Sequence, residues 1–193
     1  MTGAPGALGS WQYRRIVRTM FPLLVVLSVI VLLAGITLQD AEELLAEYGL
    51  LAIMVPTMIG TGGNLGAILS SRLTTRFHLG VVTFDITDRT VLANVAAVFA
   101  LGVTIFTALA LGAYLIGLLT GIGELQLDTL LVISLVSGLS VVVIAVVLSF
   151  LATWVSYRLG IDPDDTTIPI VTNVVDVFGM VVFLGVSAIV VGL

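Results

Sequence analysis

Five long apolar stretches dominate this sequence and restrict it to one class of fold. They cover approximately residues 18–38, 44–77, 91–119, 129–159 and 163–193. Each can cross the roughly 30 Å hydrocarbon core of a bilayer as a helix, which takes about 20 residues. Only 10% of the residues are charged, whereas soluble domains carry about 25%. The sequence therefore predicts an all-α integral membrane protein with five transmembrane helices and little mass outside the membrane.

The domain organisation that follows is simple. Residues 1–15 are expected to form a short cytoplasmic segment, too short for a regulatory domain, and residues 16–193 one five-helix transmembrane domain. The first apolar stretch is longer than the core of a signal peptide, so we expect it to be a retained span.

The arginines predict the orientation of the five spans. With five crossings, all seven fall on the same side of the membrane, and the positive-inside rule makes that side cytoplasmic. The N-terminus is then cytoplasmic and the C-terminus extracellular, as in a multi-pass protein of the cell membrane. These residues are Arg14, Arg15, Arg18, Arg72, Arg76, Arg89 and Arg158.

Composition also argues against several functions. The chain has no cysteine, which excludes disulfides, thiolate metal sites, iron–sulfur clusters and cysteine nucleophiles. A net charge of −5 without a basic cluster argues against nucleic acid as a partner. The single histidine and the lack of a G-x-S-x-G motif give no support for a serine-type enzyme. We therefore do not expect an enzyme.

The last apolar stretch contains one carboxylate, Asp176, followed by seventeen residues without a charge. A charge at that depth is costly unless it faces protein or water, and no arginine lies at a similar depth to pair with it. Thr172, Asp176 and Gly179 have the spacing of one helix face, and Asn173 is adjacent. Hydroxyl, carboxylate and backbone oxygens suit a hard cation. The alternative is a protonated or internally paired acid with a structural role.

The second apolar stretch, residues 44–77, is long for one crossing at 1.5 Å per residue. It contains Pro56 and several glycines, which predicts a helix that is kinked or locally unwound. Polar residues with helical spacing form a stripe along it: Thr57, Thr61, Asn64 and Ser71. Such a stripe either joins closely packed helices or lines a polar path, and for the latter Thr61, Gly63 and Asn64 are the candidate ion contacts.

Two segments resemble the membrane domain of the MgtE family of magnesium channels and the related eukaryotic SLC41 magnesium transporters. They are PTMIGTGGNLGAILSSRL at residues 56–73 and DPDDTTIPIVTNVVD at residues 162–176. With the five-span arrangement, the resemblance covers about residues 18–193. It implies an MgtE-type pore domain that works as a dimer, with a pore between the second and fifth spans of both copies. It also implies that Asp176 is the central ion ligand, that backbone carbonyls near Thr172 and Gly179 line the site, and that Pro56 and residues 62–64 help form the pore wall.

The resulting prediction is a divalent-cation channel or transporter in which Mg²⁺ is the transported ion. In a homodimer the two copies of Asp176 would supply a charge of −2, which matches a divalent ion. The alternatives are an exchanger coupling Mg²⁺ to Na⁺ or H⁺, one half of a heterodimer with a related subunit, and a non-transporting membrane scaffold. Bacterial members of the family carry a large cytoplasmic N-terminal sensor that has no counterpart in these 193 residues, so gating by such a sensor is not expected.

Overall fold

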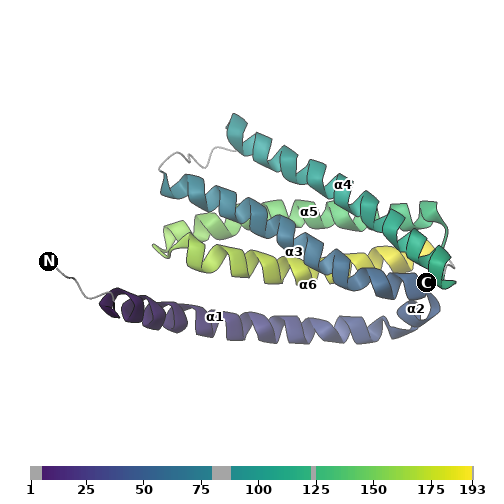
Figure 1. Ribbon diagram of the computed structural model, residues 1–193, viewed down its shortest axis with the longest axis horizontal. Helices are drawn as coiled ribbons and strands as arrows, with labels where there is room; N and C mark the ends of the chain where they lie inside the picture. The colour runs from purple at the N-terminus through teal and green to yellow at the C-terminus, as the bar shows by residue number, and fades with distance from the viewer. Residues whose placement is uncertain (1–5, 80–87, 123–124, 193) are drawn as a thin grey trace.

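The computed structural model describes residues 6–79, 88–122 and 125–192, and its regular elements are all α-helices. Figure 1 shows the long helices running side by side, with α1 along one flank of the bundle. In chain order the elements are α1 (Gly6–Asp40), α2 (Glu42–Glu47), α3 (Gly49–His78), α4 (Arg89–Thr120), α5 (Leu127–Arg158) and α6 (Pro163–Val191). Five of these, all but the short α2, are long and apolar enough to cross a membrane. The predicted all-α fold with five membrane-capable helices is thereby confirmed for the described part of the chain.

The second apolar stretch differs from its prediction. It is divided at Tyr48 into α2 and α3, and this break accounts for its excess length. The helix α3 then continues through Pro56 and the glycines that follow, so local unwinding, one of the two predicted alternatives, is wrong, while the kink stays a prediction. A proline inside a helix removes one backbone hydrogen bond without ending the helix, and most of these glycines serve helix contacts, as described below.

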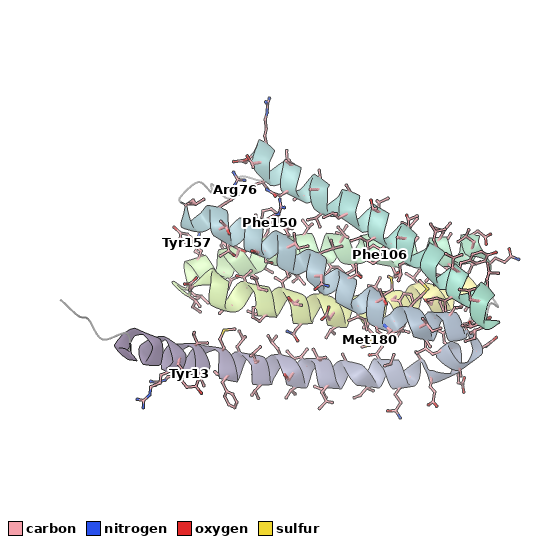
Figure 2. The ribbon with its side chains drawn as sticks, in the orientation of Figure 1. Tyr13, Arg76, Phe106, Phe150, Tyr157 and Met180 are labelled. Carbon is pink, nitrogen blue, oxygen red and sulfur yellow. The ribbon has the colours of Figure 1, made fainter. Side chains whose placement is uncertain are left out.

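The core lies where α6 packs against α1, α3 and α5, while α4 packs against α3 and α5. The ring of Phe106 (Figure 2) is fully buried and lies directly over Gly138, where a Cβ atom would overlap it. Small residues let transmembrane helices approach closely in this way. The largest fully buried side chains include Leu51, Met58, Phe106, Leu130, Ile133 and Phe183.

All seven arginines lie at one end of the bundle, because α1 and α4 begin there while α3 and α5 end there (Figure 1). We call this the arginine end. Polar contacts join α3 to α4 at this end: Arg76 pairs with Asp88 at 3.9 Å, and Arg72 donates to Asn94 at 3.0 Å. Asp88 also caps α4, and the hydrogen bond from the backbone N–H of Thr90 lowers the pKa of Asp88 below its ordinary value of 3.8.

A row of buried hydroxyls connects α5 to α3 and α6 between the arginine end and the middle of the bundle. Ser70 donates to Ser149 at 3.0 Å, and the hydroxyls of Ser156 and Thr166 share a hydrogen bond of 3.0 Å. Ser149 also donates to the carbonyl of Ala145 at 2.7 Å. Each hydroxyl is thus satisfied away from lipid, which holds the three helices together.

Candidate cation site

Asp176 lies at the middle of the span formed by α6. It comes ten residues after Thr166, where the membrane-capable part of α6 begins, which is a distance of about 15 Å along a helix. That is half of the roughly 30 Å hydrocarbon core. If this span crosses the bilayer, the carboxylate therefore lies near the middle of the hydrocarbon core.

The side chain of Asp176 fits against α3 only because residue 63 is glycine. A Cβ atom at Gly63 would overlap Oδ1 of Asp176 and would lie 3.0 Å from the methyl group of Thr172. At Gly66, one turn further along α3, a Cβ atom would lie 2.8 Å from Val171. The two glycines therefore set the close contact between α3 and α6, and Gly63 alone makes room for the carboxylate.

The carboxylate has few partners within its own chain. It is half-buried, and its buried Oδ1 makes no hydrogen bond to any described residue. The ion pair between Arg76 and Asp88 lies at the arginine end, away from Asp176. Asp176 thus keeps oxygen lone pairs that a cation could use.

Thr172 and Asn173, one turn before Asp176 on α6, also carry side-chain oxygen atoms. The hydroxyl of Thr172 donates to the carbonyl of Ile168 at 2.6 Å, and the side-chain amide of Asn173 donates to the carbonyl of Pro169 at 2.8 Å. Both side chains are partly buried. Because these bonds use the donors, the oxygen atoms of Thr172 and Asn173 remain available as acceptors for a cation or its water.

Gly179 has a different environment from the other candidates on α6. A Cβ atom there would make ordinary contacts of 3.6 and 3.7 Å with the two methyl groups of Val141 on α5. The structure therefore brings Thr172 and Asp176 together against Gly63, whereas Gly179 is turned toward α5. The small size of Gly179 thus also has a packing explanation.

The polar stripe of α3 lies next to this contact but does not face into it. Asn64 is exposed and Thr61 is half-buried, and the other two members of the stripe, Thr57 and Ser71, are exposed as well. In a single chain these groups would face lipid, where polar side chains are unfavourable.

A single copy of the chain supplies too few ligands for a complete metal site. Within the described ranges, no cluster of three or more histidine, cysteine or acidic residues could hold a metal ion. Hard cations such as Mg²⁺ take six oxygen ligands but often keep several waters and use only one or two carboxylates. The arrangement around Asp176 suits one side of such a hydrated ion.

Comparison with known proteins points in the same direction. A family model described as MgtE, divalent cation transporter, matches residues 55–186, which is more than half of the chain. The magnesium transporter MgtE of Thermus thermophilus is 29% identical over 168 residues, which cover 82% of this chain and 34% of that protein. The chain thus spans about a third of the length of this relative. The family match includes both the glycine segment of α3 and Asp176.

Proposed function

Because this chain belongs to the MgtE family of divalent cation transporters, we propose that it carries a divalent cation, Mg²⁺, across the membrane along α3 and α6. Asp176 is the central ligand in this proposal. Five membrane-capable helices and the family match make the chain a multi-pass membrane protein. The named relative is a magnesium transporter, which favours Mg²⁺ among the divalent ions.

The observation that carries the proposal is the unpaired carboxylate in the middle of α6. An ionised aspartate at the bilayer centre costs at least about 2.5–3.5 kcal/mol, and no described basic side chain offsets this cost. A passing cation would offset it. The fit of Asp176 against Gly63 holds the carboxylate in one place, as an ion site requires.

We further propose that two copies of the chain form the pore. One copy offers a single mid-membrane carboxylate, whereas two copies related by a twofold axis offer a charge of −2 for a divalent ion. The exposed stripe around Thr61 and Asn64 would then border an aqueous path instead of lipid. Since Mg²⁺ loses water reluctantly, the ion would be held largely through bridging waters on Asp176, Thr172 and Asn173.

The membrane potential can drive this transport. If the arginine end faces the cytoplasm, as the positive-inside rule favours, inward movement of a +2 ion is favoured by about 4.6 kcal/mol per 100 mV. Uptake then needs no second ion. Flux measured with and without opposing Na⁺ or H⁺ gradients separates this mechanism from exchange.

The test is Mg²⁺ flux into liposomes that contain a Mg²⁺-sensitive dye. Asp176→Ala and Asp176→Asn should both reduce flux to the level of protein-free liposomes, because each removes the charge at mid-membrane. Asp40→Asn is the matched control, since it removes an exposed carboxylate at the end of α1 and should leave flux within about twofold of the parent rate. The mass of the purified complex should equal two copies in every variant. Full flux through Asp176→Asn would reject the pore assignment.

A further inference from the structure

An apolar groove opens between α4 and α5 near the arginine end, away from the candidate cation site. Its volume is about 650 Å³, and its lining includes Val91, Leu92 and Val95 of α4 and Val147, Phe150 and Trp154 of α5. Figure 1 shows that α4 leans away from the rest of the bundle at this end. Phe150, labelled in Figure 2, lines the groove between the diverging helices. None of the lining residues belongs to α3 or α6.

The length of the groove suits a lipid chain better than a protein helix. On α5 the lining runs from Val146 to Trp154, nine residues whose ends lie about 12 Å apart along a helix. This is less than half of the roughly 30 Å hydrocarbon core, so the groove stays within one leaflet. A transmembrane helix from a partner would need a seam along most of the core, whereas an acyl chain lies within one leaflet.

The mouth of the groove carries positive charge. The guanidinium of Arg158 lies over the ring of Trp154, 5.2 Å from its centroid, a cation–π contact that keeps this charge beside the groove wall. Arg89, the first residue of α4, is exposed and comes two residues before Val91. Asp88 lies next to Arg89 in the sequence, but its carboxylate is occupied by Arg76 and by the start of α4.

We propose that this groove binds an anionic phospholipid of the leaflet at the arginine end. One acyl chain lies between α4 and α5, and Arg158 and Arg89 contact the phosphate. Basic pockets between transmembrane helices recognise anionic headgroups in this way on the cytoplasmic side of membranes. The lipid fills the space between the diverging helices, so it should also stabilise the packing of α4 on α5. This site does not depend on the proposed transport function.

The experiment compares dioleoyl-phosphatidylglycerol with dioleoyl-phosphatidylcholine, which have the same chains but different headgroup charge. The purified 193-residue chain in detergent is titrated with each lipid. Bound lipid is counted by native mass spectrometry, and the melting temperature is measured on the same samples. The parent chain should retain phosphatidylglycerol preferentially, and this lipid should raise its melting temperature in a saturable way.

Two variants separate the roles of chain and headgroup. Val147→Phe places a larger side chain in the groove at an exposed position. It should reduce retention of phosphatidylglycerol about tenfold, because it keeps roughly two methylene groups of the acyl chain out of the groove. Val143→Phe, also exposed and one turn away on α5, is its control and should have no effect. Arg158→Gln should weaken the binding of phosphatidylglycerol about fivefold without changing the binding of phosphatidylcholine. Arg18→Gln on α1 is its control and should change the binding of neither lipid.

Three results would overturn the proposal. The first is equal retention of the two lipids by the parent chain. The second is unchanged retention in Val147→Phe, which would place the bound lipid elsewhere. The third is a change in the mass of the protein complex in Val147→Phe but not in Val143→Phe, which would identify the occupant as a second protein chain.

Discussion

Replacing Gly63 by alanine should displace the carboxylate of Asp176. The new Cβ atom would lie 3.1 Å from Cγ of Asp176 and 3.0 Å from the methyl group of Thr172, and closer still to Oδ1 of Asp176. Carbon atoms in contact prefer about 3.5–4.0 Å. Either the carboxylate turns away or α3 and α6 separate, in both cases by about 0.5–1 Å.

The expected energies are modest for folding and large for transport. Overpacking of this kind costs about 1–3 kcal/mol, and the better helix propensity of alanine returns up to about 1 kcal/mol. A net loss of about 0–2 kcal/mol leaves the protein folded. Because an ion site loses its ligand geometry when the carboxylate moves by this much, we expect Gly63→Ala to lower Mg²⁺ flux at least tenfold.

Two further glycines provide matched controls for the same chemical change. Gly66→Ala brings its Cβ within 2.8 Å of Val171 and so strains the contact of α3 with α6 without touching the carboxylate. Gly112→Ala on α4 has no atom within 4 Å of the new methyl group. The melting temperature should fall in Gly63→Ala and Gly66→Ala and should not fall in Gly112→Ala.

The assay is again dye-reported Mg²⁺ flux in liposomes, with melting temperatures measured on the same preparations. Flux should fall much further in Gly63→Ala than in Gly66→Ala at similar thermal stability. If Gly63→Ala transports Mg²⁺ at the parent rate and with the same concentration dependence, the contact between Gly63 and Asp176 is packing alone and does not position an ion ligand.

Two further predictions concern stability. Ser149→Ala removes the buried acceptor for Ser70 and should destabilise the chain in detergent by about 0.6 kcal/mol, and by at most about 1.7 kcal/mol. Ser140→Ala is the control, because it loses only a hydrogen bond to its own helix, and it should cost less. Equal losses of stability in the two variants would contradict a role of Ser149 in joining helices. The hydrogen bond from Thr90 lowers the pKa of Asp88, so the stability that Asp88 contributes is present above pH 3.8 and is lost as the pH falls through the lowered value. The difference in melting temperature between the parent chain and Asp88→Ala should therefore be larger at about pH 6 than at about pH 3, and a constant difference would rule out this origin.

The number of membrane-capable helices could be predicted from sequence because hydropathy depends on composition along the chain and not on tertiary contacts. The break at Tyr48 could not be predicted in this way, since residues 42–47 are good helix formers and lie directly before an apolar stretch. In the structure α2 packs against α3 and α1 and is separate from the span.

The candidate site was predictable in part. An isolated acid in an apolar stretch identifies Asp176, and helical spacing correctly places Thr172 beside it. The role of Gly63 was not accessible, because a glycine needed for close approach and a glycine needed for backbone freedom look alike in a sequence. What distinguishes them is the neighbouring helix, here α6 with Asp176 in contact with the glycine.

Three buried hydroxyls of α5 near the arginine end have a signal in the sequence as well. Ser149, Thr153 and Ser156 have the spacing i, i+4 and i+7, so they share one face of an otherwise apolar helix. The same rule that identified the polar stripe of α3 would have found them. Helical spacing alone does not show that the hydroxyls of α5 are buried among helices while the polar stripe of α3 is mostly exposed, since burial depends on which helix packs on which face.

The start of α3 at Gly49 limits how this chain can change in length during evolution. Gly63 follows fourteen residues later, and one residue gained or lost in between would rotate it by about 100° and slide it by about 1.5 Å. A deletion would bring Asn64 to the carboxylate in place of Gly63, and an insertion would bring Thr61 to the position where Gly62 meets Val141. Natural variation in length should therefore collect before Gly49, in and around α2, where an extra residue leaves the alignment of α3 with α6 unchanged.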